Sequence, residues 1–129
     1  MSNGHVVESF KTASTLLAYR IVSPSTSTAD TVGYPSGGTM LPIGVTTNQA
    51  FNSVVPVQMN GLAKIFFNDT CLAAGIVKSD TSGRGTMLTL GTTSTATTLS
   101  AAYVGRLVGP AVAATGTVAM VAILPGYAR

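Results

Sequence analysis

The chain has 129 residues, of which only 9% are charged and 46% are hydrophobic, and its formal net charge is +3. A chain of this length forms one domain by default, and its hydrophobic fraction excludes a disordered protein. The positive charge reflects a shortage of acids, because seven Lys and Arg are spread along the sequence against four Asp and Glu. A nucleic-acid-binding protein usually gathers its basic residues into a patch, so no nucleic-acid partner is expected.

Residues 1–15 are mostly polar, with Val6, Val7 and Phe10 as scattered apolar positions. This composition predicts an extended N-terminal arm that precedes a domain of residues 16–129. The three apolar side chains are the candidate anchors of the arm, because an extended segment can bind a partner by adding a strand to it. The segment has no basic region followed by an apolar run, so no secretory signal is expected.

The first half of the domain alternates short apolar runs with turn formers. Residues 16–23 predict a strand, with Arg20 turned outward. Residues 24–39 predict a long surface loop that contains a short strand around Val32. A short strand with a central glycine is expected at 43–45.

Asn60 and Gly61 stand between two β-rich runs, residues 54–59 and 62–67. Asn-Gly is the strongest short signal for a two-residue hairpin turn, in which both central residues have positive φ. The sequence therefore predicts that these two runs pair as a hairpin and that Asn60 and Gly61 are structural turn residues.

Farther along, residues 74–78 and 86–90 predict two strands joined by a turn over 79–85. Residues 91–100 are rich in Thr and predict a loop or an edge strand.

Residues 107–126 carry no charge and are numerous enough to cross a membrane. Gly116 and Pro125 interrupt the run, which is typical of strands and turns rather than of a membrane helix. We interpret it as the end of a strand over 104–108, a connection with a structural turn at Gly116, and a strand over 117–124. Both faces of that last strand are apolar, which predicts burial on two sides. No membrane partner is expected.

Two stretches, 42–61 and 104–126, share one pattern. Each has a short strand with a central Gly, a loop, and a longer β-rich run that ends at Gly. The pattern predicts one strand-loop-strand unit used twice. With about eight short strands separated by turns and no helical periodicity, the sequence predicts an all-β protein, a small single-domain sandwich or barrel.

Few residues are suited to hold a metal or a cofactor. His5 and Cys71 are the single His and the single Cys, and a metal site needs three or four ligands. Cys71 is expected to be a small buried apolar residue of a protein kept in a reducing compartment.

A four-residue motif that begins at Asp80, with the sequence DTSG, resembles the catalytic loop of aspartic proteases. Such enzymes need two aspartates that share a proton, and a dimer could supply the second. The third position of the motif is Ser rather than Gly, and no apolar run precedes it, so a surface hairpin turn is the favoured interpretation. No catalytic residue is assigned.

A further pattern spans residues 16–126. It comprises residues 18–22, 42–45, 54–61, 63–65, 73–77, 82–85, 104–107 and 117–126. In its order of elements and its spacing of Gly and β-branched residues, the chain resembles the head decoration, or capsid cement, proteins of tailed bacteriophages, such as the decoration protein of phage lambda. It departs from them in a longer loop at 24–39 and a longer N-terminal arm.

The resemblance implies a β-domain of the β-tulip type, with no enzymatic activity and no cofactor. It implies a virion protein, made in the bacterial cytoplasm of the host, that binds the outer surface of the assembled capsid. The implied partners are the phage major capsid protein and further copies of the chain, in a trimer or alternatively a dimer. Such proteins bridge neighbouring capsid subunits and stabilise the shell against the pressure of packaged DNA.

The composition agrees with a protein that buries surface against partners, because charge is scarce and repeated weak contacts over a shell add up. Two alternatives stay open. One is a nucleic-acid-binding β-barrel, although its aromatic residues are scattered rather than gathered in a groove. The other is a small aspartic protease that uses Asp80.

Overall fold

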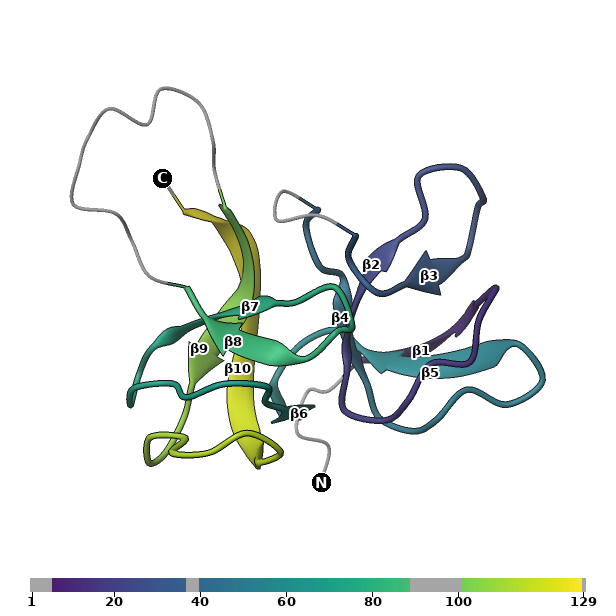
Figure 1. The fold of residues 1–129 in the computed structure, drawn as a ribbon. Coiled ribbons are helices and arrows are strands. Elements are labelled where there is room, and N and C mark those ends of the chain that lie inside the picture. The colour runs from purple at the N-terminus through teal and green to yellow at the C-terminus, as the bar shows by residue number, and fades with distance from the viewer. Residues whose placement is uncertain (1–5, 37–39, 89–100, 129) are drawn as a thin grey trace.

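A computed structural model describes residues 6–36, 40–88 and 101–128 (Figure 1). Within these ranges the chain forms ten β-strands and no helix, which confirms the predicted all-β class. The strands are β1 (Val7–Lys11), β2 (Ile21–Pro24), β3 (Val32–Gly33), β4 (Gly44–Thr46), β5 (Val54–Gln58), β6 (Leu62–Phe66), β7 (Ile76–Ser79), β8 (Gly85–Met87), β9 (Ala101–Leu107) and β10 (Val118–Ala128). The Thr-rich segment 91–100 lies outside the described residues.

The strands form two five-stranded antiparallel sheets with the same topology. The first has the order β1-β5-β4-β2-β3, and the second has the order β6-β10-β9-β7-β8. Adding five to each label of the first sheet gives the second, so we call β1–β5 the first unit and β6–β10 the second unit. The predicted strand-loop-strand repeat corresponds to β4–β5 and β9–β10, which hold the same places in the two units. In Figure 1 the units lie side by side, with β4 between them.

Each unit has its own hydrophobic cluster, and the sheet of the first unit contributes residues to both clusters. The cluster of the first unit contains the buried residues Leu16, Val22, Val32, Val55 and Val57. The cluster of the second unit contains Ala63, Ile65, Phe67, Cys71, Val77, Val104, Leu107, Val112, Val121 and Ile123, together with Ile21 and Val45 of the first unit. We call the face of each sheet that lines its own cluster the inner face and the opposite face the outer face.

Alternation along β2 explains how the first unit contributes to both clusters. Successive side chains of a strand point to opposite faces, so Val22 lies in the first cluster while Ile21 lies in the second. Val45 is paired with Ile21 in the sheet and shares its face. The outer face of the first unit therefore covers the inner face of the second, and the two sheets fold as one small β-sandwich.

The predicted hairpin at Asn60 and Gly61 is wrong. The runs on either side of it are β5 and β6, and these belong to different sheets. β5 already has β1 and β4 as neighbours, so it has no free edge for β6, which pairs with β10 instead. Gly61 has a φ of 79°, but Asn60 is not among the residues with positive φ. The two residues thus form a turn between sheets rather than a hairpin turn with both φ positive.

The prediction that residues 117–124 are buried on both faces is also wrong in part. β10 is central, between β6 and β9, and its inner-face residues Val121 and Ile123 are buried. On the other face Val118 and Leu124 are 42% and 63% exposed. The two-sided apolar pattern therefore reflects one core face and one uncovered face. None of the described segments forms a helix that could span a bilayer.

Val7–Lys11, in the segment predicted to be an arm, is extended and forms β1 at the edge of the first sheet. It pairs in antiparallel register with β5, from Val7 opposite Gln58 to Lys11 opposite Val54. Residues 1–5 lie outside the described residues. The boundary at residue 15 and the β-tulip subtype stay predictions.

Candidate docking surface

The apolar residues predicted to anchor the arm lie in or beside β1. Val6 and Val7 are 44% and 49% exposed, whereas Phe10 is half-buried against the first cluster. Because side chains alternate along a strand, Val6 and Phe10 lie on the inner face and Val7 lies on the outer face. The structure therefore does not place the three on one face. It leaves Val6 and Val7 exposed at a sheet edge, where a partner can add a strand or pack.

The predicted turn residues position this edge and the second unit. The side-chain oxygen of Asn60 accepts a hydrogen bond from the Val6 amide at 2.7 Å, and the Gly61 carbonyl accepts one from the Ile123 amide at 2.9 Å. Gly116 has a φ of 83° and donates its amide to the Phe67 carbonyl at 2.8 Å. Each turn thus fixes one end of a strand, which is a structural role.

Arg20 fastens the two units together, contrary to the prediction that it turns outward. Its guanidinium carbon lies 4.8 Å from the centre of the Phe66 ring, within the range of a cation–π interaction. Its Nη1 donates a hydrogen bond to the Ser82 carbonyl at 3.2 Å. Nearby, the Ile21 amide donates to the Gly83 carbonyl at 2.7 Å. Sequence analysis missed this contact, because the partners are distant along the chain and the pattern around Arg20 is that of an ordinary strand.

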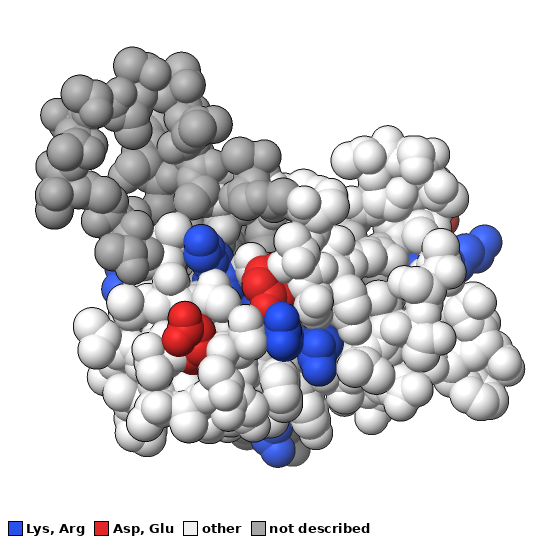
Figure 2. Space-filling model, in the orientation of Figure 1, with Lys and Arg blue, Asp and Glu red and all other residues white. Residues whose placement is uncertain are grey.

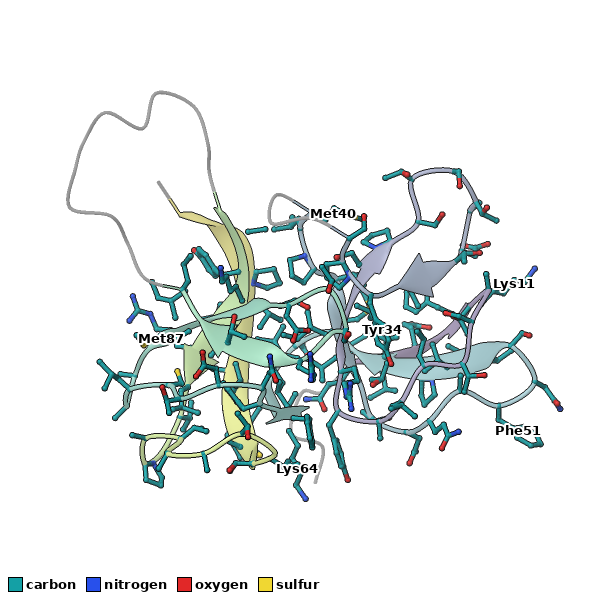
Figure 3. The ribbon with its side chains drawn as sticks, viewed as in Figure 1. Lys11, Tyr34, Met40, Phe51, Lys64 and Met87 are labelled. Atoms are coloured by element: carbon teal, nitrogen blue, oxygen red, sulfur yellow. The ribbon has the colours of Figure 1, made fainter. Side chains whose placement is uncertain are left out.

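A groove of about 310 Å³ runs along the boundary of the units. Val45 and Gln58 line one wall, and Leu62, Lys64 and Met120 line the other. The Gln58 side chain donates hydrogen bonds to the backbone carbonyls of Asn60 and Leu62, both at 2.8 Å. Figure 3 shows Lys64 on β6 with its side chain pointing away from the body. The groove is mainly apolar and opens onto the outer face of the second unit.

The outer face of the second unit is a largely apolar and partly exposed sheet surface. Its apolar positions are Leu62, Phe66, Val118, Met120, Ala122 and Leu124, with Lys64 and Arg106 among them. Leu62 is 43% exposed. Figure 2 shows Lys and Arg scattered over the visible face and interleaved with Asp and Glu, with large uncharged areas between them. Such a surface is suited to packing against protein rather than to following a phosphate backbone.

Asp80 is the centre of a hairpin turn between β7 and β8. Its Oδ1 accepts hydrogen bonds from the amides of Ser82 and Arg84 at 2.8 and 2.9 Å. Its Oδ2 accepts a hydrogen bond from Arg84 Nε at 2.9 Å, which completes an ion pair. Both carboxylate oxygens are therefore engaged within the turn, as the hairpin interpretation predicts.

Cys71 is buried in the second cluster, as its sequence context predicts. Burial raises the pKa of the Cys71 thiol, because the thiolate loses its hydration. His5 lies outside the described residues. In the part of the chain that the structure describes, no group of three or more His, Cys, Asp and Glu could hold a metal ion.

No protein-family model matches the sequence, and no curated protein matches it. Among solved structures, the chain is similar to the N base of the head fiber gp8.5 in bacteriophage phi29. The TM-score is 0.66 at 14% sequence identity, and the match covers 93% of this chain and 94% of that chain. The two chains therefore share their fold over nearly their whole compared lengths.

Proposed function

We propose that the chain is a structural protein of a bacteriophage head, a decoration or cement protein that binds the outer surface of the capsid. The observation that carries the proposal is the fold shared with the N base of a phage head fiber over 93% of the chain. A resemblance to head decoration proteins, based on the spacing of Gly and β-branched residues, points to the same class. In this role the chain bridges major capsid subunits as a trimer or dimer and strengthens the shell.

The surface chemistry supports a role in assembly. The edge strand β1 exposes Val6 and Val7, and β5 is its one neighbouring strand within the described sheet. A capsid loop that packs on this edge would bury both valines and gain backbone hydrogen bonds. We propose that Val6 and Val7 contact the capsid.

The proposal is tested on virions of the phage that encodes the chain. Mass spectrometry of purified heads, separated from tails, should detect the chain, and cryo-electron microscopy should place it on the outer surface. Heads produced without it should bind the purified protein in a co-sedimentation assay and then release DNA at a higher temperature. A chain that is absent from heads and does not bind them would overturn the proposal.

The capsid contact has its own pair of variants. Val7→Asp should weaken co-sedimentation with heads, because it places a charge at the centre of the exposed edge. Leu72→Asp is the control, since Leu72 is also an exposed apolar residue but lies in the β6–β7 connection of the second unit. If both variants bind heads as well as the wild type, the contact lies elsewhere while head association stands.

A further inference from the structure

The two units match in hydrogen bonds as well as in strand order. The Thr46 amide donates to the Arg20 carbonyl at 2.8 Å, and the Leu107 amide donates to the Gly75 carbonyl at 2.9 Å. Three further pairs of backbone hydrogen bonds repeat in this way, each given from the donor amide to the acceptor carbonyl. They are Met59 to Val6 matched by Ile123 to Gly61, Thr12 to Ser53 matched by Phe67 to Thr117, and Thr47 to Pro56 matched by Val108 to Met120.

Backbone conformation repeats at the same positions. Tyr19 and Ala74, two residues before β2 and β7, have φ of 62° and 60°, although non-glycine residues rarely adopt positive φ. The register also repeats, because Val22 pairs with Gly44 as Val77 pairs with Gly105. These agreements make the units two copies of one structural unit, so the paired residues of β1, β2, β4 and β5 each have an equivalent in the second unit.

The covered face of the first unit has an uncovered equivalent in the second. Ile21 and Val45, on the outer face of the first unit, are fully buried against the second unit. Their equivalents by register are Ile76, which is half-buried, and Arg106, which is exposed. The second unit therefore carries an equivalent face, on which the described residues leave Arg106 exposed and Ile76 partly exposed.

The inner face of the first unit shows the complementary difference. In the second unit, Ile65, Val104 and Ile123 are buried in the cluster that also contains Ile21 and Val45 of the first unit. Their equivalents in the first unit are Phe10, Ile43 and Met59, and all three are only half-buried. Within the described residues, the first unit contributes Ile21 and Val45 to the cluster of the second unit, whereas the cluster of the first unit contains no residue of the second.

Charge agrees with pairing these two surfaces. Inside the chain, Val45 and Ala63 belong to one buried cluster and line the same groove. Their equivalents are Arg106 on the outer face of the second unit and Glu8 on the inner side of β1. Both side chains are exposed. Placing one face on the other would bring an arginine to a glutamate.

We infer that the occupant of these surfaces is a second copy of the chain: the outer face of the second unit of one copy packs on the half-buried Phe10, Ile43 and Met59 of the first unit of the next. The contact repeats the packing within the chain. It does not repeat every hydrogen bond, because the Lys11 amide already donates to the Asp30 carbonyl. It is heterologous, so it propagates from copy to copy and closes into a ring when the rotation permits. The inference deepens the proposed head function by naming the surfaces of self-association.

Charge reversal tests the contact on purified full-length protein by sedimentation velocity over a concentration series, without capsids. The wild type should self-associate, and Glu8→Arg or Arg106→Glu should each raise the dissociation constant about tenfold or more. The double variant should restore association, because the pair is re-formed with opposite signs. Lys11→Glu is the control, since this exposed lysine also lies on β1 but on the opposite face from Glu8. A wild type that stays monomeric at millimolar concentration would overturn the inference.

A cross-link gives a second readout. The variant with Glu8→Cys and Arg106→Cys should form disulfide-linked oligomers on mild oxidation, and each single variant should not form chains longer than a dimer. Failure of the double variant to cross-link beyond the single variants contradicts the contact. If the charge reversals weaken binding to heads and leave self-association unchanged, the occupant is the capsid rather than a second copy, and the inference falls while the head function stands.

Discussion

Gly44 and Gly105 hold equivalent places in β4 and β9, and each lies against the backbone of the neighbouring strand. A Cβ on Gly44 would collide with the Gln58 carbonyl oxygen, and one on Gly105 would collide with the Ala122 carbonyl oxygen. Backbone atoms in a paired strand cannot move aside as a flexible side chain can. The close approach of two strands therefore requires glycine at the same point of both units.

We expect Gly44→Ala and Gly105→Ala each to lower the free energy of unfolding by about 3 kcal/mol, since both overpack a buried ladder. Gly33→Ala is the matched control, because Gly33 also lies in a strand and a Cβ there would meet nothing within 4 Å. Its effect should stay within about 0.5 kcal/mol. Urea unfolding measures all three, and equal losses in the three variants would contradict the steric explanation.

The two glycines also show how much of the fold could be predicted from the sequence. The central Gly in the two short strands revealed the repeated strand-loop-strand pattern, and alternation and turn residues located most strands. Which strands pair was harder to predict from the sequence. The hairpin signal at Asn60 and Gly61 describes local geometry, whereas strand pairing depends on packing between distant segments. The strand expected over 16–23 begins only at Ile21, since Tyr19 has a φ of 62° that no local pattern announces.

The candidate docking surface was predictable in part. The exposure of Val6 and Val7 follows from the polar composition around them, and Phe10 differs because its position on β1 turns it toward the first cluster. The Arg20 contact with Phe66 joins residues of different sheets, so only the fold reveals it. The equivalence of Glu8 with Ala63 likewise requires the strand register.

Ala74 has a φ of 60° and an exposed side chain in the β6–β7 connection. A left-handed conformation is costly for alanine and free of that cost for glycine. We expect Ala74→Gly to raise the free energy of unfolding by about 0.5–1 kcal/mol. Ala73→Gly, at an exposed neighbour without positive φ, should lower it instead. Thermal unfolding of the two variants gives the comparison, and a loss of stability in both would show that Ala74 is not strained.

The hairpin role of Asp80 predicts different results for two substitutions. Asp80→Ala removes three hydrogen bonds, one of which is the ion pair with Arg84, and it should cost about 2 kcal/mol of stability. Asp80→Asn keeps an oxygen that can accept from the Ser82 and Arg84 amides, so its cost should be about 0.5–1 kcal/mol. Chemical denaturation measures both. The protease alternative instead predicts peptide cleavage by the wild type that Asp80→Asn abolishes without a change in stability.

The buried thiol of Cys71 makes stability depend on alkaline pH. Burial raises the pKa of this thiol in the folded state. The contribution of the neutral thiol to folding stability is therefore fully present below the unfolded pKa of about 8.5, and it is lost as pH rises through the folded pKa. Above about pH 8.5 the unfolded chain gains stability by ionising this group. We expect the stability difference between wild type and Cys71→Val to shift against the wild type between pH 7 and about 9.5. A difference that does not change with pH would contradict the burial of the thiol.

The apolar C-terminal run gives the sharpest comparison, because two apolar residues of β10 lie on opposite faces of the sheet. Val121 is fully buried on the inner face, and Leu124 is 63% exposed. Val121→Asp places an unpaired charge in the second cluster and should lower the free energy of unfolding by more than about 4 kcal/mol. A loss of this size is close to the whole stability of a small domain, so most molecules should be unfolded. Leu124→Asp should change stability by about 0.5 kcal/mol or less. Far-ultraviolet circular dichroism and urea unfolding of both variants check this, with a β-type spectrum expected for the wild type. Equal tolerance at the two positions, or a helical spectrum, would refute the central strand and the two-unit fold built around it.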